Sequence, residues 1–289
     1  MSVLLVTGPS AFIGRHALAA LSARAYDIHA LCRNPVPEIA PTARWHAVDL
    51  MDRRLVHELC ARLRPTYLLH MAWCASNPSY RADPANDQWA NASKALASAF
   101  FSNGGKRAVF AGTSAEYEAP EKQSPYVKSK ITAAQAMQAR ARACGGSFAW
   151  GRIFLPYGPD DAAHRLVPST IDALLAGRLA QCSAGDQVRD FVYAGDVGAA
   201  FALLLESKLE GPNDVGTGCG TSVRHAVEEI ARQVGRPDLV RFGAVVPSAT
   251  EPKSLVARPE ALLALHWQPR TLSTGLGLTI AWHRARLHA

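Results

Sequence analysis

Short apolar segments alternate with longer amphipathic segments through the first half of the chain. The apolar segments have the continuous pattern of buried parallel strands, and we predict them at residues 2–8, 27–34, 44–50, 66–73, 107–114 and 147–154. The segments between them have helical periodicity, which predicts helices at residues 12–25, 53–64, 88–105 and 126–144. Strands and helices that alternate at this spacing form βαβ units with right-handed crossovers. The sequence therefore predicts an α/β fold with a doubly wound parallel sheet.

The second half of the chain is more irregular. Gly/Pro-rich joints interrupt it at GPNDVGTGCGTS and VPSATEP. We predict a smaller, mixed α/β part there that closes over the sheet. The expected domains are residues 1–155 and residues 156–289, the second partly interleaved with the first.

Composition and charge narrow the class of protein. No apolar run approaches the roughly 20 residues that span a bilayer, and the opening MSVLLVTGPS lacks the basic region of a signal peptide, so we expect a cytoplasmic chain without a membrane partner. The net charge of +7 comes from scattered arginines rather than a basic block. This argues against a nucleic-acid partner and leaves attraction to a phosphorylated substrate as the alternative. The six cysteines contain no CxxC pair, so neither a metal site nor a disulfide framework is predicted.

The turn after the first strand is suited to binding phosphate. Gly8 ends the strand and Gly14 lies in the following helix, with Ala11 between them, so the spacing is GxxAxxG rather than GxGxxG. In dinucleotide-binding, Rossmann-like folds such a turn lets the backbone approach the pyrophosphate at the helix N-terminus, and the last glycine allows close helix–sheet packing. The methyl group of Ala11 is expected to be a modest obstacle. We assign Gly8, Ala11, Phe12, Ile13 and Gly14 to cofactor binding; a plain strand-to-helix turn is the alternative.

The ends of the next strands predict which dinucleotide binds. NAD-binding domains usually carry an acidic residue at the end of the second strand, whereas an arginine accommodates the 2′-phosphate of NADP. This chain has Arg33 there and no carboxylate. We therefore predict NADP, with NAD as the second choice and an ordinary exposed arginine as the alternative. Asp49 and Leu50 are expected to border the adenine and Ala72 to contact the cofactor, which makes residues 1–155 a dinucleotide-binding domain.

Tyr126 and Lys130 are one helical turn apart in the segment SPYVKSK. Residues at i and i+4 share a helix face, and proline is favoured in the first helical turn. The two side chains are therefore neighbours whatever their role. Because Tyr-x-x-x-Lys also occurs by chance in many soluble proteins, the spacing permits a catalytic pair without requiring one.

Six motifs give the chain a resemblance to a known family. TGPSAFIG, VDL, LLHMAW, GTSAEY, SPYVKSK and RDFVYAGDV occur in the order and spacing of extended short-chain dehydrogenases/reductases, and more narrowly resemble the nucleotide-sugar epimerase/dehydratase/reductase group. The resemblance covers essentially the whole chain. It implies that Tyr126 exchanges a proton with the substrate oxygen during hydride transfer at the nicotinamide, and that Lys130 holds the nicotinamide ribose. Tyr126 and Lys130 are both expected to contact the cofactor as well. Lowering the pKa of a tyrosine from about 10 to about 7 requires about 4 kcal/mol, to which the lysine and the nicotinamide are expected to contribute.

The resemblance also implies a catalytic hydroxyl group at the end of the fifth strand. Counting back four residues from Tyr117, as the family pattern does, selects Thr113. Ser114 is its rival and a candidate substrate contact, and a β-branched residue that simply ends a strand is the other interpretation of Thr113. Dehydratases of the group carry an Asp-Glu pair directly after the catalytic Thr. Here Ser114-Ala115 occupy those places and Glu116 comes one place too late, so dehydration is not expected.

The same resemblance implies substrate contacts in the second half of the chain. The segment GDQVRDF matches the one whose arginine meets the substrate diphosphate, which assigns Arg189. Arg165 and Arg270 are weaker candidates that also fit surface or structural roles. Asn91 matches a family position that shapes the sheet and the site, or is an ordinary polar helix residue. The predicted partner is a nucleotide-diphosphate sugar, bound mainly by residues 156–289.

These features predict an NADP-dependent oxidoreductase that reduces a keto group of a nucleotide-activated deoxysugar. The segment GTSAEYE adds a resemblance to reductases that make CDP-activated or similarly activated deoxyhexoses. One alternative is an NAD-dependent nucleotide-sugar 4-epimerase, which uses the same catalytic residues and keeps its cofactor bound. A more distant alternative is a cofactor-binding sensor without catalysis. By analogy with the family, we expect a homodimer that packs the helices near residues 91–102 and 127–143.

Overall fold

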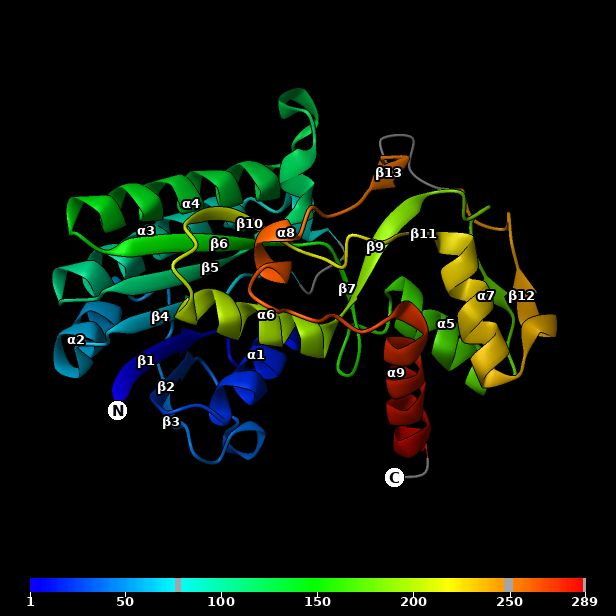
Figure 1. The fold of residues 1–289 in the computed structure, drawn as a ribbon, viewed down its shortest axis with the longest axis horizontal. Helices are drawn as coiled ribbons and strands as arrows, with labels where there is room; N and C mark the ends of the chain where they lie inside the picture. Colours follow the sequence, from blue (N-terminus) through cyan, green and yellow to red (C-terminus); the bar gives the residue numbers. More distant parts are fainter. Residues whose placement is uncertain (76–78, 247–251, 288–289) are drawn as a thin grey trace.

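The larger of two structural units is built on a sheet whose strands are all parallel (Figure 1). The computed structural model describes residues 1–75, 79–246 and 252–287. From one edge of the sheet to the other, the strands are β10 (Gly211–Val215), β6 (Ser147–Ile153), β5 (Arg107–Thr113), β4 (Tyr67–His70), β1 (Ser2–Thr7), β2 (Tyr26–Cys32) and β3 (Arg44–Ala47). The strand order reverses between β1 and β4. Ligands of such sheets bind in the crevice at the carboxyl ends of the strands on either side of this reversal.

Helices cover both faces of this sheet (Figure 1). One face carries α1 (Phe12–Ser22) and α6 (Ala194–Glu206), and the other carries α2 (Arg53–Leu63), α3 (Ala85–Ser102) and α4 (Pro125–Ala143). Successive side chains of a strand point to opposite faces, so β1 contributes to both cores. Leu4 and Val6 belong to the core under α1 and α6, and Leu5 belongs to the core under the other three helices. Burial on both faces explains why β1 is a continuous apolar run.

Local sequence determines where two of the helices begin. Pro125 is the first residue of α4, where its missing N–H costs nothing, and this places Tyr126 in the first helical turn. The helix α7 (Val223–Val234) begins after Ser222, whose hydroxyl accepts a hydrogen bond of 3.1 Å from a backbone N–H of the first turn. It ends at Gly235, which has the left-handed φ of 86° that favours glycine.

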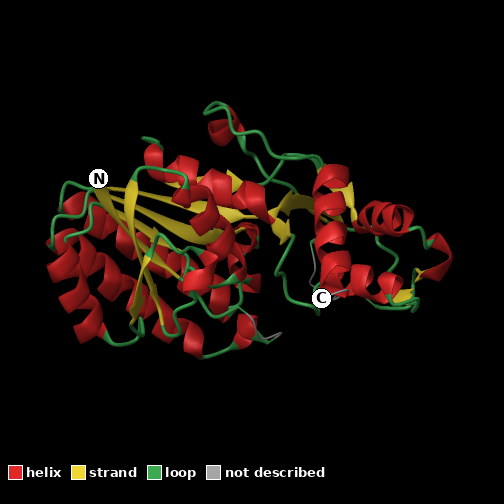
Figure 2. Ribbon diagram, turned by 90° about the horizontal axis from the view of Figure 1, so that it is seen from below, coloured by secondary structure: helices red, strands yellow, loops and turns green. Residues whose placement is uncertain are grey.

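The smaller unit contains most of the chain after residue 155 (Figure 2). One of its sheets consists of β7 (Leu155–Tyr157), β9 (Val188–Tyr193), β11 (Gly220–Ser222) and β13 (Ser254–Leu255), and a second consists of β8 (Ala180–Gln181) and β12 (Val240–Arg241). The helices α5 (Leu166–Leu175), α7 and α9 (Leu272–Leu287) pack around a separate core, and α8 (Glu260–Leu263) returns beside β10. Short 3₁₀-helices are η1 (Pro37–Ile39), η2 (Tyr80–Ala82), η3 (Ser114–Tyr117), η4 (Pro120–Lys122) and η5 (Pro237–Leu239). Among the described helices, none has the length and apolar content needed to cross a bilayer.

The predicted α/β fold with a Rossmann-like, doubly wound parallel sheet is confirmed. The strands β3 and β4 end at Ala47 and His70, before the predicted ends at residues 50 and 73. Each is followed by one further backbone hydrogen bond to its neighbour, from the N–H of Val48 to Cys32 and from that of Met71 to Thr7, and the chain then leaves the ladder. The segments α6 and β10 come after residue 155 in the chain but belong to the larger unit, since β10 pairs with β6 and α6 packs beside α1. The chain therefore crosses between the two units more than once.

Candidate active site

The turn between β1 and α1 is closed so tightly that two of its glycines cannot carry a side chain. Gly8 has a φ of 68°, and a Cβ on it would lie 2.7 Å from the backbone N and Cα of Ala72. A Cβ on Gly14 would lie 1.9 Å from the carbonyl oxygen of Gly8. The absence of a side chain at Gly14 therefore lets the turn itself close, which is a more local role than the predicted helix–sheet packing.

The N-terminus of α1 presents uncapped backbone N–H groups at this turn. Ala11 is the N-cap residue, and the first turn of α1, all of which the structure describes, holds no acidic residue. Ala11 has an ordinary φ of −73° and is exposed, so its methyl group does not obstruct the backbone as predicted. An uncapped helix N-terminus beside a glycine turn fits the pyrophosphate of a dinucleotide. The backbone amides of Phe12 and Ile13 are the groups that would hold it.

The residues after β2 and β3 fit the predicted adenosine end of the cofactor. Arg33 directly follows β2 and is exposed, and within the described part of the chain its guanidinium makes neither a hydrogen bond nor an ion pair. Such a free guanidinium is suited to the 2′-phosphate of NADP. Asp49 is exposed and its carboxylate accepts a 2.9 Å hydrogen bond from the N–H of Met51, whereas Leu50 is buried.

The three predicted catalytic residues meet at the carboxyl end of β5. Thr113 is the last residue of β5, and Tyr126 lies in the first turn of α4 with Lys130 one turn later. The Thr113 side chain acts on the phenol of Tyr126 by lowering its pKa, and Lys130 Nζ lies 5.8 Å from the centre of the Tyr126 ring. Both Tyr126 and Lys130 are buried. The arrangement therefore brings a hydroxyl, a phenol and an amine together in a site that largely excludes water.

Aromatic rings enclose the amine of Lys130. Its Nζ lies 4.3 Å from the centre of the Trp73 ring and 4.7 Å from that of Phe110, and it donates a 2.7 Å hydrogen bond to the carbonyl oxygen of Ala111. Cation–π contacts of this kind partly replace the lost hydration of an ammonium group. The periodicity of the sequence shows no sign of this enclosure, because the two rings come from separate segments of the chain.

Burial raises the pKa of Tyr126 above its ordinary value. The neighbouring Tyr80 and Glu116 raise it further, while the Thr113 side chain and the charge of Arg165 lower it without reversing the shift. The protein without its cofactor therefore does not produce the lowered pKa that the sequence predicts. Removing the phenolate from water raises the pKa by more than the neighbouring groups lower it. Without a cofactor, Tyr126 is therefore protonated at neutral pH.

Burial lowers the pKa of Lys130 to about 7, although the charge of Glu116 opposes the shift. An unfolded lysine keeps its proton up to about pH 10.4. Between these pKa values the unfolded state binds one proton more than the folded state, so stability rises with pH. We expect the unfolding free energy of the wild type to rise, relative to that of Lys130→Met, by up to about 1.4 kcal/mol per pH unit. Urea denaturation between about pH 7.5 and about pH 9.5 measures this difference.

Lys128→Met is the matched control for this prediction, because Lys128 is exposed on the same helix. Its difference from the wild type should not change with pH. A difference for Lys130→Met that stays constant, or that falls as the pH rises, would contradict a buried lysine that loses its proton near neutrality.

Glu116 supports the end of β5 instead of facing the site as an acid. Its carboxylate oxygens accept hydrogen bonds of 3.1 Å from the backbone N–H of Thr113 and 3.1 Å from Nε1 of Trp150. The Thr113 hydroxyl in turn accepts a 3.3 Å hydrogen bond from the N–H of Ala115. Thr113 and Glu116 thus cap η3 together, and Ser114, the rival of Thr113, is buried as the first residue of that helix. Both carboxylate oxygens of Glu116 therefore hold η3 against β5 and β6.

Arg165 is electrostatically coupled to the catalytic group. It is the N-cap residue of α5 and forms a 3.5 Å ion pair with Asp161, and its charge is one of those that act on Tyr126. Burial raises the pKa of Asp161 to about 6 despite this ion pair. Of the predicted substrate-binding arginines, Arg165 is therefore the one whose charge reaches the catalytic phenol.

The other predicted polar contacts have different surroundings. Arg189 is buried in β9 and donates a 2.8 Å hydrogen bond to the carbonyl oxygen of Val188. Arg270 has a structural role, because the Asp196 carboxylate accepts a hydrogen bond from its guanidinium and another, of 2.7 Å, from its backbone N–H. Asn91 is exposed on α3. This exposure fits the alternative that Asn91 is an ordinary polar residue of a helix.

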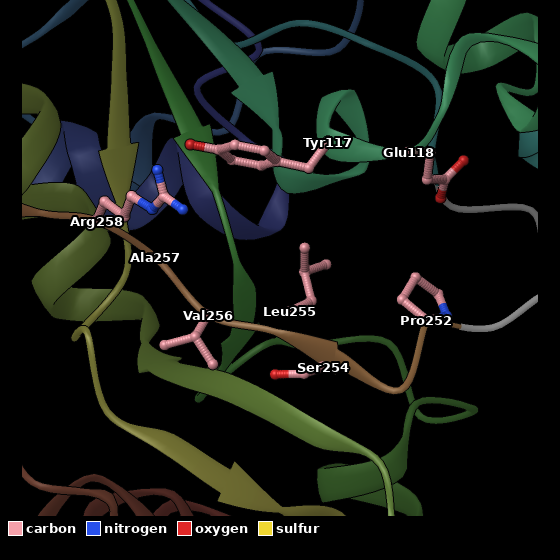
Figure 3. A pocket seen from close by; sticks show the side chains of 8 residues that line it. All are labelled: Tyr117, Glu118, Pro252, Ser254, Leu255, Val256, Ala257 and Arg258. Carbon is pink, nitrogen blue, oxygen red and sulfur yellow. The ribbon is translucent and has the colours of Figure 1, made fainter.

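A cavity beside η3 was not predicted from the sequence (Figure 3). This Tyr117 cavity measures about 490 Å³, with η3 and the next residue on one side and the segment 252–258 on the other. Its lining residues are Tyr117, Glu118, Pro252, Ser254, Leu255, Val256, Ala257 and Arg258. Figure 3 shows the guanidinium of Arg258 directed toward the hydroxyl end of Tyr117. The segment 252–258 follows an irregular joint without strand or helix periodicity, so no pattern indicated that it would line a cavity.

Charged groups hold one side of the Tyr117 cavity in place. The Tyr117 hydroxyl donates a 2.9 Å hydrogen bond to the buried carboxylate of Asp214, which also accepts one of 2.9 Å from the backbone N–H of Arg258. The guanidinium carbon of Arg152 lies 4.4 Å from the centre of the Tyr117 ring, and Arg152 forms a 2.8 Å ion pair with Asp214. Because η3 directly follows Thr113, the cavity begins one short helix away from the Thr113 hydroxyl.

The fold and the site together define a class of protein. A parallel sheet with a tight glycine turn after β1, and with Thr, Tyr and Lys side chains meeting at the end of β5, is the arrangement of a short-chain dehydrogenase/reductase. The chain belongs to the NAD dependent epimerase/dehydratase family, whose model matches residues 4–216. It is accordingly an NAD(P)-dependent enzyme of the extended short-chain dehydrogenase/reductase type.

Several known proteins resemble the chain over nearly its full length. CDP-abequose synthase of Salmonella typhimurium is 26% identical over 280 residues, which are 92% of this chain and 93% of the relative. UDP-glucose 4-epimerase of Rhizobium meliloti is 27% identical and covers 92% of each chain. The crystal structure of UDP-glucose 4-epimerase of Thermus thermophilus in complex with NAD is 29% identical, with a TM-score of 0.85 over 98% of this chain and 99% of that one.

Proposed function

We propose that this chain is an NADP-dependent oxidoreductase that reduces a keto group of a nucleotide-activated deoxysugar. The observation that carries the proposal is the meeting of Thr113, Tyr126 and Lys130 at the carboxyl edge of the sheet that also bears the Gly8 turn. The names of the relatives support the substrate class, because CDP-abequose synthase and UDP-glucose 4-epimerase both act on nucleotide sugars by name.

Each residue of the site has a distinct proposed task. Tyr126 donates its proton to the keto oxygen, and Thr113, whose side chain acts on the pKa of the phenol, holds that same oxygen. Lys130 holds the nicotinamide ribose. The dinucleotide, when bound, supplies the hydride. Arg165 and Arg189 are proposed to contact the diphosphate, and the Tyr117 cavity to receive part of the substrate.

The protonation of the site favours reduction over epimerisation as the first step. A reductase begins by protonating the substrate oxygen, whereas a 4-epimerase begins by removing a proton from an alcohol. Because burial raises the pKa of Tyr126, the cofactor-free chain holds the form needed for the first of these reactions. The epimerase remains the second candidate, since UDP-glucose 4-epimerases are among the similar proteins and one of them was crystallised with NAD.

Arg33→Ala tests the choice of dinucleotide. The free guanidinium at the end of β2 would form charge-assisted hydrogen bonds with the 2′-phosphate, each contributing about 1.5–3 kcal/mol. We therefore expect the Kd for NADPH to rise by about 10–100-fold, while the Kd for NADH stays within about twofold because NADH lacks that phosphate. Isothermal titration calorimetry of both dinucleotides against the wild type and the variant measures the two effects.

Arg142→Ala is the matched control for Arg33→Ala, because it removes the same charge from an exposed position in the last turn of α4. Equal weakening of NADPH and NADH binding in Arg33→Ala would show that Arg33 does not recognise the 2′-phosphate. NAD⁺ that stays bound through purification, with no preference for NADPH, would favour the epimerase. A wild-type chain that bound dinucleotide but consumed no NADPH with any nucleotide-linked keto sugar would overturn the reductase.

The proposed assembly is a cytoplasmic homodimer that packs α3 and α4 of each subunit. Small side chains such as Ala95 lie along α3 and allow close helix packing. Among the described residues, the large apolar side chains that are exposed lie outside these two helices. The dimer would therefore depend on close backbone approach and polar contacts rather than on a large apolar patch, and sedimentation analysis measures the oligomeric state.

A further inference from the structure

A buried network of hydrogen bonds connects the end of β1 to the end of β4 and to α3. His70 Nδ1 lies 2.6 Å from the hydroxyl of Thr7, and His70 Nε2 lies 2.8 Å from the hydroxyl of Ser93. The Thr7 hydroxyl accepts a hydrogen bond of 3.3 Å from the N–H of Ala72, and the Ser93 hydroxyl donates one of 2.8 Å to the carbonyl oxygen of Trp89. Thr7, His70 and Ser93 are fully buried.

The direction of these hydrogen bonds defines the tautomer of His70. The hydroxyl proton of Ser93 goes to a carbonyl oxygen, so Ser93 must accept from Nε2–H of the imidazole. Nδ1 then has no proton and accepts from the hydroxyl of Thr7, which in turn accepts from Ala72. Every donor among the hydrogen bonds of Thr7, His70 and Ser93 has an acceptor only when His70 is neutral.

A second proton on His70 would break this order and place a charge in the core. Burial lowers the pKa of His70 to about 3, and the nearby Lys130 lowers it in the same direction. The imidazole also stacks on Phe110, with ring centres 5.1 Å apart, and Phe110 is one of the two rings that enclose Lys130 Nζ. The neutral imidazole therefore contacts both the end of the cofactor turn and the enclosure of the catalytic lysine.

We propose that His70 is a positioning residue that holds the Gly8 turn and the Ala72 backbone in the one arrangement that accepts the dinucleotide. This rests on the proposed function, because the ligand is the cofactor assigned there. Thr7 directly precedes Gly8, and Gly8 approaches Ala72 so closely that not even a methyl group fits between them. At such a contact a small displacement of Thr7 or Ala72 moves the whole turn. His70 prevents that displacement by fixing the hydroxyl that joins the two strand ends.

A variant of His70 and a variant of a buried hydroxyl outside the network provide the test. His70→Phe keeps a ring against Phe110 but removes both nitrogen atoms, and we expect its Kd for NADPH to be at least about tenfold higher than that of the wild type. Thr279→Ala removes a fully buried hydroxyl of α9 that, among the described residues, bonds only to the carbonyl oxygen of Gly275 in its own helix. It should lower the melting temperature but leave the Kd within about threefold. Calorimetric titration with NADPH and thermal unfolding of each variant give both quantities.

Each outcome of this experiment decides the proposal. A purely structural His70 would lower the melting temperature in both variants and leave both Kd values unchanged, which would overturn the positioning role. If His70→Phe did not fold, Thr7→Val carries the same expected loss of affinity, and Thr7→Ser, which keeps the hydroxyl, should restore it. A wild-type chain that bound neither NADPH nor NADH would overturn the proposed function as well. Normal binding by the wild type and by His70→Phe would overturn the positioning role alone.

Discussion

Tyr126→Phe will reduce NADPH-dependent turnover by about 10²–10⁴-fold, the usual contribution of a positioned proton donor. The change removes only the hydroxyl that meets Thr113. The ring itself packs edge-on against Tyr80, with ring centres 4.9 Å apart, and against Trp73, with ring centres 6.2 Å apart, and phenylalanine keeps both contacts. The Kd for NADPH should stay within about twofold of the wild type, because the variant removes a group that acts on the substrate oxygen. Steady-state kinetics with a nucleotide-linked keto sugar, together with calorimetric titration of the cofactor, measures the two effects.

Tyr26→Phe is the matched control for this result. Tyr26 lies at the start of β2, and its hydroxyl makes a long, 3.5 Å hydrogen bond to Glu206 at the exposed end of α6. Turnover of this variant should equal that of the wild type. Unchanged turnover in Tyr126→Phe would remove Tyr126 from the mechanism, and lost turnover with equally lost cofactor binding would make it a residue of the cofactor site.

Asp190→Ala will destabilise the chain by at least about 3 kcal/mol, the effect of leaving several buried donors without an acceptor. The Asp190 side chain is fully buried in β9. Its carboxylate accepts hydrogen bonds from the N–H and hydroxyl of Thr217 at 2.8 and 2.7 Å, from the N–H of Gly218 at 2.8 Å and from that of Ala257 at 3.1 Å. One carboxylate thus joins the loop after β10 to the segment that lines the Tyr117 cavity. Urea denaturation of the cofactor-free chain measures the loss.

Asp186→Ala is the control for this prediction, because Asp186 is exposed a few residues earlier in the same segment. Its unfolding free energy should stay within about 0.5 kcal/mol of the wild type. Asp190→Asn should be closer to the alanine variant than to the wild type, because its amide keeps one accepting oxygen and turns an NH₂ group toward N–H groups that cannot accept from it. A loss below about 1 kcal/mol in Asp190→Ala would mean that solvent or a rearranged loop satisfies the donors.

The strands and helices of the first half were predictable because their signals are local. A run such as residues 2–8 is apolar at nearly every position since both faces of β1 are buried, and the positions of Gly8 and Gly14 follow from a turn only a few residues long. The i, i+4 spacing of Tyr126 and Lys130 follows equally from the geometry of one helix. The resemblance to a family supplied what spacing could not, namely the prediction that this pair and Thr113 act on one substrate.

The surroundings of these residues were not predictable, because they come from segments far apart in the chain. Trp73, from the turn after β4, and Phe110, from β5, enclose Lys130. Glu116, one place too late for a dehydratase acid, became part of the cap of η3 through contacts with Thr113 and Trp150. The Tyr117 cavity likewise requires the segment 252–258 to pack against η3.

The sequence by itself determined the order of the elements, the tight glycine turn after β1 and the pairing of Tyr126 with Lys130 on one helix face, since each depends on neighbours within a few residues. Only the tertiary structure decided their protonation. Removal from water raises the pKa of Tyr126 and lowers that of Lys130, and the cost of removing a charge from water depends on everything packed around it. That packing unites distant segments, so it is a property of the folded chain and is absent from any single stretch of residues.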